Sequence, residues 1–353
     1  MRQLLLDNFH AYPLMQPQDC VKLLYQSHFG CGHFVADPPQ ALARLQTEYR
    51  PCPHTDAPLF EPLGGGYCRL NLSALDEADL SLDTLCRLFI YSSGQQVSGR
   101  DSFLADLALL DAMVQQRQLP LDAAQWAHFL AQYRADGYPA VSHSSAYREA
   151  YHPAYRVLHQ SCQNDWPVLT AIDRLLRQQG GGAIAIDGGS GTGKSHLAGM
   201  LAAVFPASVV HMDDFFLQGF QRTPQRLAEP GGNLDYERFL AQVVPYLGTE
   251  DAFSYDIFDC SCGKLSGKQA VAPLPLRIVE GVYSQHPKWS GQFDLKVFLT
   301  ADRAIRLKRI EARSGSFLLK RFQEEWIPKE DLYFDTFSIP RLADLAIDTG
   351  TFF

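Results

Sequence analysis

The stretch Ala183-Ile-Ala-Ile-Asp187 runs directly into Gly188-Gly-Ser-Gly-Thr-Gly193-Lys194-Ser195. The five leading residues form a short apolar run typical of a buried strand, and the next eight match G-x-x-x-x-G-K-[ST], the Walker A pattern of a P-loop. In such a loop the glycines let backbone N–H groups turn inward around a phosphate, and the following helix presents its positive end to the same charge. The stretch therefore predicts a nucleotide-binding domain.

The loop also supplies the residues that we expect to hold ATP and Mg²⁺. Lys194 should reach the β- and γ-phosphates, and the Ser195 hydroxyl should ligate the magnesium ion. The full predicted nucleotide-binding set is Gly188, Gly189, Ser190, Gly191, Thr192, Gly193, Lys194, Ser195 and His196.

Short apolar runs on both sides of the loop predict the strands of one parallel sheet. They are Ala183–Ile186, Ser208–Met212, Leu276–Val279, Leu295–Leu299 and Leu345–Ile347. Asp235–Leu247 and Asp302–Arg313 fit crossover helices, because parallel neighbours in a sheet cannot be joined by tight turns. The predicted fold class is α/β, a P-loop three-layer sandwich with a mostly parallel sheet.

The sequence before residue 180 has a different, helical periodicity. Phe103, Leu107, Leu110 and Val114 recur at intervals of three and four residues. Residues 169–176 carry one more apolar helix face, and the glycines from Gly180 should end that helix. A mainly α-helical domain is therefore expected to precede the α/β domain.

Composition limits the classes of partner and compartment. The 353 residues are 46% hydrophobic and 20% charged, which is enough apolar material for a folded core, and the net charge of -8 argues against a nucleic-acid-binding face. No run approaches the ~20 apolar residues of a membrane span, and residues 1–10 lack secretory-signal features. The eight scattered Cys suggest reduced thiols. We expect a cytoplasmic protein, and leave a homo-oligomer open.

Two P-loop classes fit the sequence poorly. The Asn-Lys-x-Asp motif by which GTPases read guanine is absent. Leu265-Ser-Gly-Lys-Gln269 is superficially like the signature of transporter ATPases, but the acidic pair expected after the next strand is missing, because Val279 is followed by Glu280 and Gly281. We therefore expect neither a GTPase nor a transporter ATPase.

A small-molecule kinase needs a carboxylate near the end of the second strand to accept a proton from the attacking hydroxyl. Asp213 is our candidate for this base and Asp214 the fallback, although both acids could instead cap a helix or face solvent. Glu280, at the end of the next apolar strand, is the candidate for orienting Mg²⁺ through water, or else it is only structural.

Arginines are expected to neutralise charge on the transferred phosphoryl group. Arg306, Arg309 and Arg313 follow an i, i+3, i+7 spacing along one helix face. We interpret Arg309 and Arg313 as catalytic lid residues and Arg306 as a weaker candidate. The alternative is an ordinary solvated helix face.

These features together resemble the uridine kinase, phosphoribulokinase and pantothenate kinase group. The motifs that occur in that group's order are the loop with Asp187 before it, Asp213-Asp-Phe-Phe216, Glu280-Gly-Val-Tyr283 and the arginine helix. A bacterial uridine kinase-like branch is similar over nearly all of residues 181–353, with the likeness clearest at Met212–Leu217, Gln221-Arg-Thr, Gly231–Phe239, Asp259-Cys260 and Trp326-Ile-Pro.

The resemblance implies roles for residues that pattern alone does not assign. Asp213 matches the catalytic base, Asp235 matches a residue that binds sugar hydroxyls, and Tyr255 matches the aromatic residue beside a nucleobase. We therefore count Asp214, Asp235, Tyr255 and Phe216 as candidate substrate-binding residues. Two positions depart from nucleoside kinases: Phe216 replaces a Tyr, and Cys260 replaces a base-reading His. A site that discriminates a base depends on such hydrogen-bonding groups, so uridine itself is not settled by the resemblance.

The N-terminal half is similar to the domain that precedes the kinase in the same branch, notably over residues 16–35, 64–72 and 151–158. That likeness implies no activity. His28, His33 and His152 are candidates for a metal or phosphate site, against the alternative of structural histidines without zinc-like spacing. A further hypothesis groups Arg69 and Arg156 with Tyr67 and Tyr151 for an anionic small molecule.

The sequence thus predicts a mainly helical domain of unknown function over residues 1–165, a connector helix over 166–180 and a P-loop kinase domain over 181–353. The expected activity is transfer of the ATP γ-phosphoryl group to a hydroxyl of a small-molecule acceptor, such as the nucleoside uridine. The alternative is a nucleotide-dependent switch, in which ATP binding controls the helical domain and a partner reads the change.

Overall fold

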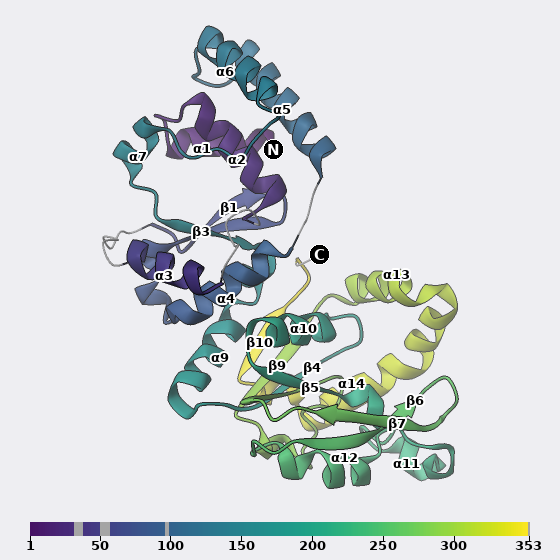
Figure 1. Ribbon diagram of the computed structural model, residues 1–353. Coiled ribbons are helices and arrows are strands. Elements are labelled where there is room, and N and C mark those ends of the chain that lie inside the picture. Colours follow the sequence, from purple (N-terminus) through teal and green to yellow (C-terminus); the bar gives the residue numbers. More distant parts are fainter. Residues whose placement is uncertain (32–37, 50–56, 96–98, 352–353) are drawn as a thin grey trace. The chain divides into compact units, whose positions relative to one another are not determined.

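A computed structural model describes residues 1–31, 38–49, 57–95 and 99–351 of the chain (Figure 1). The chain divides into two compact units, Met1–Gln163 and Asn164–Phe353. Each unit contains its own set of fully buried apolar side chains, for example Leu23 and Leu88 in the first and Ile184 and Ile278 in the second. Each unit therefore has a hydrophobic core of its own.

The first unit is mainly helical, as predicted, and it also contains a small sheet that the sequence pattern did not predict. Its helices are α1 (Arg2–Ala11), α2 (Pro17–Phe29), α3 (Pro38–Tyr49), α4 (Leu82–Ser93), α5 (Arg100–Gln115), α6 (Ala123–Ala135), α7 (Ser145–Tyr151) and α8 (Gln160–Asn164). The strands β1 (Phe60–Gly64), β2 (Tyr67–Asn71) and β3 (Tyr155–His159) form an antiparallel sheet in the order β1-β2-β3. All five residues of β2 are buried, so this strand lacks the alternation that would have revealed it.

Local capping explains where several of these helices begin. At α2, Gln16 and Asp19 form a capping box and Pro17 occupies the first turn. The Ser81 side chain accepts a hydrogen bond from the Thr84 amide at the start of α4, and Asp122 accepts one from Gln125 at α6.

The second unit contains the predicted parallel sheet. All five predicted runs are strands: β4 (Gly182–Gly188), β5 (Ala207–His211), β8 (Leu276–Glu280), β9 (Leu295–Thr300) and β10 (Leu345–Asp348), in the order β10-β9-β4-β8-β5. Every neighbouring pair is parallel. The helices α9 (Trp166–Gln179) and α10 (Lys194–Val204) pack on strands of this sheet. A parallel sheet with flanking helices confirms the predicted P-loop α/β fold.

The remaining elements of the second unit lie around that sheet. Short helices α11 (Pro224–Ala228) and α12 (Tyr236–Gln242) follow β5, and α14 (Ile327–Phe337) and α15 (Ile339–Leu342) precede β10. The long helix α13 (Arg303–Arg321) leads into a π-helical turn over Phe322–Trp326. Gly315, with φ 77°, interrupts the helical geometry of α13. The predicted crossover helices at 235–247 and 302–313 thus correspond to α12 and to the first part of α13.

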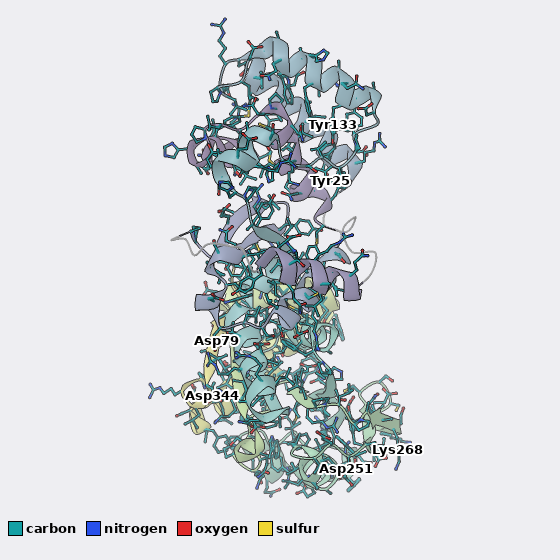
Figure 2. The ribbon with its side chains drawn as sticks, turned by 60° about the vertical axis from the view of Figure 1, so that its left-hand side comes forward. Tyr25, Asp79, Tyr133, Asp251, Lys268 and Asp344 are labelled. Atoms are coloured by element: carbon teal, nitrogen blue, oxygen red, sulfur yellow. The ribbon has the colours of Figure 1, made fainter. Side chains whose placement is uncertain are left out.

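A two-stranded antiparallel hairpin, β6 (Phe253–Asp259) and β7 (Lys264–Val271), forms a sheet of its own that is not hydrogen-bonded to the main sheet as a strand neighbour. The sequence pattern did not predict it, because seven of the eight residues of β7 are exposed and the strand carries no apolar face. Lys268 on β7, labelled in Figure 2, has a side chain that is 69% exposed and lies 3.7 Å from Asp256.

Among the residues that the structure describes, no helix is long and apolar enough to cross a membrane. The seven cysteines in the described ranges are free thiols. Five of them are buried, while Cys260 and Cys262, in the β6–β7 turn, are exposed.

Candidate functional site

The glycine-rich loop follows β4 at the carboxyl edge of the sheet and adopts a backbone that requires glycine. Gly188 has φ 140°, and a Cβ atom there would lie 2.3 Å from the carbonyl oxygen of Leu299. Gly191 has φ 82°, and a Cβ there would lie 2.8 Å from the carbonyl oxygen of Arg306. Side chains at these two positions would clash with neighbouring backbone, so the loop's close packing depends on glycine.

Within the loop, the side chains of Thr192 and Lys194 hold its shape. The Thr192 hydroxyl donates to the Gly189 carbonyl at 2.8 Å, and the Lys194 ammonium donates to the same carbonyl at 3.1 Å. Lys194 is also the first residue of α10, so the loop ends at a helix N-terminus. Ser195 and His196 are exposed on the first turn of that helix. This is the strand–loop–helix arrangement that binds phosphate through backbone N–H groups.

A buried carboxylate from far along the chain also binds the loop. Glu330 of α14 is 3% exposed and accepts a hydrogen bond from the Ser190 amide at 3.0 Å, as well as one from the Ser190 hydroxyl. Arg306 pairs with the same carboxylate at 2.9 Å and donates to the Ser190 carbonyl at 2.8 Å. Glu330 and Arg306 therefore fix the middle of the loop from outside.

The three arginines of α13 have different environments. Arg309 donates to the Gly191 carbonyl at 3.3 Å and to the carbonyl of Thr349 at 2.7 Å. With Arg306, it therefore contacts loop backbone. Arg313 is exposed and donates to the Ser314 hydroxyl at 3.2 Å, yet it lies near enough to Asp213 for its charge to oppose the rise that burial causes in the pKa of that carboxyl. The structure thus brings all three predicted arginines to the site region, but two of them bind the loop itself.

Asp187, immediately before the loop, is fully buried and accepts four hydrogen bonds. Its donors are the amides of Gly188 at 2.7 Å, Tyr283 at 3.2 Å and Gln285 at 3.0 Å, and the Tyr333 hydroxyl at 2.9 Å. Burial raises the pKa of Asp187 to about 6, and these hydrogen bonds oppose the rise. Asp187 therefore joins β4, the segment after β8 and α14.

Glu280 ends β8 at the level of the loop. Its register partners are Ile186 on β4 and His211 on β5. The Ser195 hydroxyl donates to Glu280 Oε1 at 3.1 Å, and His211 Nδ1 lies 2.6 Å from the same oxygen. The hydrogen bond to Glu280 raises the pKa of His211. The two residues predicted to hold magnesium, Ser195 and Glu280, are therefore in direct contact.

Asp213 lies in the 3₁₀ turn directly after β5. Its side chain is reached by solvent, but surrounding protein atoms desolvate it enough to raise its pKa. Lys194 lowers this pKa and Glu280 raises it. The candidate base, the loop lysine and the candidate metal residue thus lie within electrostatic range of one another.

The candidate substrate-binding residues form a connected group next to Asp213. Tyr255 is fully buried, and its hydroxyl donates to Asp214 at 2.9 Å. Asp235 is 3% exposed, caps α12 and pairs with Arg238 at 3.2 Å. Phe216 is half-buried and forms an isolated bridge with Leu234. In this structure Tyr255 and Asp235 are engaged with protein groups.

Three residues of the site were missed by sequence reasoning: Glu330, His211 and Thr349. Thr349 is 3% exposed and donates through its hydroxyl to the Thr192 carbonyl at 2.9 Å. Glu330 and Thr349 come from elements more than one hundred residues after the loop, and no local motif marks them. His211 offered a signal, since it lies in the predicted strand 208–212 that leads to Asp213, and it ends β5 in the structure.

The histidines of the first unit do not assemble into a metal site in the described residues. His28 is buried and contacts Asp106 at 2.8 Å and Ser102 at 3.3 Å, and His152 follows α7 with φ 43°. His33 lies outside the described residues. No group of three or more His, Cys, Asp or Glu side chains suited to a metal ion occurs within the described ranges.

The second unit does fit a magnesium–nucleotide. A glycine loop with close backbone packing and a lysine suits phosphates, and the Ser195 hydroxyl with the Glu280 carboxylate provides the hard oxygen atoms that Mg²⁺ prefers. Magnesium usually keeps several waters and needs few protein ligands when phosphates supply the rest. Two oxygen donors beside the loop are therefore sufficient.

No protein-family model matches the chain, and no curated protein matches it either. Solved structures do resemble it. A possible uridine kinase from Bacillus stearothermophilus is 22% identical, with 52% of this chain and 100% of that chain covered and a TM-score of 0.39. A protein assigned as a fructose transport system kinase, from Silicibacter sp. TM1040, is 25% identical, with 53% and 96% covered and a TM-score of 0.41.

The protein YGR205w is a third similar structure, at 15% identity, with 51% of this chain and 93% of that chain covered and a TM-score of 0.35. All three resemblances cover about half of this chain. Because the TM-scores are low, we take no functional conclusion from them.

Proposed function

We propose that the second unit is an ATP-dependent kinase that transfers the γ-phosphoryl group to a hydroxyl of a small metabolite. The observation that carries this proposal is the meeting of three strand ends. The loop with Lys194 follows β4, Glu280 ends β8, and Asp213 follows β5. Carboxyl ends of parallel strands are where α/β proteins bind their ligands.

Each residue then has a defined task. Loop amides and Lys194 hold the phosphates, while Ser195 and Glu280 hold Mg²⁺, which when bound neutralises phosphate charge. Asp213 takes the proton from the acceptor hydroxyl. At the same time the hydroxyl oxygen of the acceptor forms the new bond to the γ-phosphorus, and ADP leaves. The raised pKa of Asp213 makes its carboxylate a stronger base towards the acceptor hydroxyl. The Arg313 guanidinium offsets negative charge near Asp213. Arg309 contributes by fixing the loop.

The acceptor is proposed as a class, with uridine as the first compound to test. Asp214, bonded to Tyr255, lies beside Asp213 in the chain and offers a second carboxylate for acceptor hydroxyls. Cys260 is exposed, and its pKa is raised by desolvation and by Asp213. The influence of Asp213 on Cys260 supports placing the Cys260 thiol near the acceptor, where nucleoside kinases have a base-reading imidazole. A panel should therefore include sugars and vitamins as well as nucleosides.

The test is phosphoryl transfer by Asp213→Asn compared with Asp251→Asn, a matched change at an exposed aspartate labelled in Figure 2. We expect Asp213→Asn to reduce turnover by about 10² to 10⁴-fold, the usual contribution of a general base, while Mg–ATP affinity stays within about twofold. Asp251→Asn should behave as wild type. Near wild-type turnover by Asp213→Asn would remove this residue from the role of base.

A nucleotide-dependent switch is the second candidate, and the size of the first unit favours it. Met1–Gln163 is compact with its own core, which metabolite phosphorylation by the second unit does not require. In a switch, ATP would bind without turnover of any acceptor, and a partner would be captured only with nucleotide present. Product formation from the acceptor panel would instead support the kinase.

A further inference from the structure

The first unit contains a buried guanidinium whose hydrogen-bonding capacity is largely unused. Arg69 on β2 is 3% exposed. Its contacts to Asn8 Oδ1 and Gln26 Oε1 are long, at 3.5 and 3.4 Å, and Glu61 approaches no closer than 3.9 Å. The buried Nε has no hydrogen-bond partner among the described residues. A guanidinium has five donors, and leaving buried donors unsatisfied is unfavourable, so this arrangement calls for a further partner.

The groups around Arg69 suit an anion. Its guanidinium carbon lies 4.8 Å from the ring centre of Tyr155, which holds its plane. Glu61, opposite Arg69 in the β1–β2 register, is bound by the Tyr12 hydroxyl at 2.8 Å. Tyr12, Glu61 and Tyr155 are all partly exposed, whereas Arg69 is not. An anion that replaced the distant Glu61 carboxylate would give Arg69 the close, bidentate partner that it lacks.

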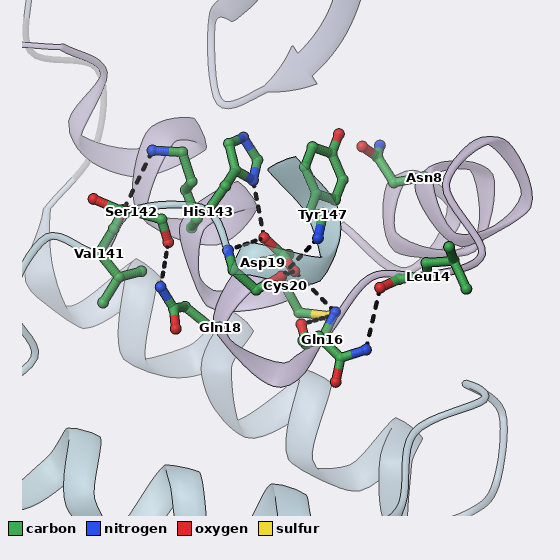
Figure 3. A network of polar contacts seen from close by, with 12 residues as sticks. Asn8, Leu14, Gln16, Gln18, Asp19, Cys20, Val141, Ser142, His143 and Tyr147 are labelled. Atoms are coloured by element: carbon green, nitrogen blue, oxygen red, sulfur yellow. Dashed lines mark hydrogen bonds and ion pairs between the residues drawn. The ribbon is translucent and has the colours of Figure 1, made fainter. Parts of the chain in front are cut away.

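A polar chain ends on the same tyrosine. Figure 3 shows Asp19 and His143, where His143 Nδ1 lies 2.9 Å from Asp19 Oδ1. His143 Nε2 lies 2.7 Å from the Tyr155 hydroxyl. Because Asp19 can only accept, Nδ1 carries the proton and Nε2 is left to accept from Tyr155. This carboxylate–imidazole pair fixes the orientation of the Tyr155 hydroxyl, while burial raises the pKa of Tyr155, so the hydroxyl keeps its proton.

Contacts within the protein explain the positions of Asp19 and Arg156, but they do not explain the burial of Arg69. Asp19 also accepts from the Gln16 amide at 2.9 Å and from Ser144 at 2.9 and 2.6 Å, which fastens the start of α2 to the start of α7. Arg156, the neighbour of Tyr155, has a partner in Glu48 at 2.7 Å. Of the two arginines that the sequence suggested for an anion, the structure favours Arg69, with Tyr155 and Tyr12 in place of Tyr67 and Tyr151.

We propose that the first unit has a ligand site of its own, in which Arg69 binds the acid group of a small organic anion. The anion displaces Glu61, and the Tyr155 hydroxyl, whose proton is directed at His143, accepts a hydrogen bond from a donor group of the ligand. The acid group is a carboxylate or a phosphate, both of which match a guanidinium fork. All of the residues of this site belong to the first unit.

The experiment uses the full chain carrying Lys194→Ala, which weakens phosphate capture by the nucleotide loop, and the Arg69 variants identify the binding that belongs to the first unit. Inorganic phosphate and malonate are titrated separately by calorimetry, and the better probe identifies the acid group. We expect one probe to bind saturably, Arg69→Met to weaken that binding about tenfold or more, and Glu61→Gln to tighten it several-fold by removing the competing carboxylate. Arg156→Met, which removes the same charge from the neighbouring strand, should change it by less than about twofold.

A second readout separates ligand binding from support of the fold. If Arg69 were there for stability, Arg69→Met would lower the unfolding temperature strongly; at a ligand site, an apolar side chain of similar length should be neutral or stabilising. Should Arg69→Met fail to fold, Arg69→Lys and Glu61→Gln decide, with weaker binding in the first and tighter in the second supporting the site. Absence of saturable binding of both probes, or binding unaffected by Arg69→Met, Arg69→Lys and Glu61→Gln, would overturn the proposal.

Discussion

The two units each have a polar centre, and the centres are built in opposite ways. In the second unit, eight consecutive residues form the loop, and side chains such as Arg306 and Glu330 only support it. In the first unit, Asp19, Arg69, His143 and Tyr155 come from four separate segments and form the centre with their side chains. A phosphate cradle made of the backbone N–H groups of one loop needs a continuous strand–loop–helix, whereas a site made of side chains can be assembled from separate segments. Only the first kind leaves a contiguous motif in the sequence.

The largest effect should come from Lys194→Ala. Removing the one loop ammonium that can reach the phosphates should reduce turnover at least 10²-fold and weaken Mg–ATP binding, as measured by acceptor phosphorylation and calorimetry. Lys268→Ala, at an exposed position on β7, is the matched control and should be neutral. Equal activity of the two variants would show that Lys194 does not bind the nucleotide. The second unit would then lack the loop-based site that distinguishes it from the first unit.

The next largest effect should come from Glu330→Ala. This change leaves Arg306 half-buried without its carboxylate and removes the acceptor of the Ser190 amide, so the free energy of unfolding should fall by about 3 kcal/mol. Mg–ATP affinity should fall as well, because the loop loses its external support. Glu324→Ala removes a 67% exposed glutamate with a partner at 3.9 Å, and should change neither quantity measurably. Unchanged nucleotide affinity in Glu330→Ala would mean that the loop is rigid without Glu330.

Asp19→Asn removes a buried hydrogen-bond acceptor from the first unit, as Glu330→Ala does in the second. An amide cannot accept at both ends, so at least one pair of the bonds from Gln16, His143 and Ser144 is lost, at a cost of about 2 kcal/mol. Chemical denaturation should detect this loss, whereas Asp7→Asn, at an exposed aspartate, should be neutral. In a kinase that acts through the second unit, Mg–ATP affinity should be unaffected. A clear loss of affinity would favour the switch.

The smallest effect is confined to acidic pH and concerns Asp187. Its pKa of about 6 in the folded chain exceeds the ordinary value of 3.8, so the folded state holds this proton more tightly. The contribution of Asp187 to stability is therefore greatest below about pH 4 and declines as pH rises to about 6. The difference in unfolding free energy between wild type and Asp187→Asn, measured from pH 4 to 7, should follow that decline. A flat difference would contradict the raised pKa.

The fold of the second unit could be predicted because its strands are short buried runs and its motif is contiguous. β4, β5, β8, β9 and β10 all coincide with predicted runs. The hairpin β6–β7 and the sheet β1–β2–β3 could not be predicted, since β7 is nearly all exposed and β2 is buried throughout, so neither alternates. Glu330 and Thr349 were missed for another reason: they reach the loop through tertiary packing, which spacing does not encode.

The carboxylate before the loop has a consequence for how this region opens. The amides of Gly188, Tyr283 and Gln285 all donate to Asp187. None of these N–H groups can meet solvent until that shared acceptor is released, so hydrogen–deuterium exchange at all three should be slow and should give a common opening free energy. Amides nearly one hundred residues apart in the sequence would then exchange through one and the same local opening.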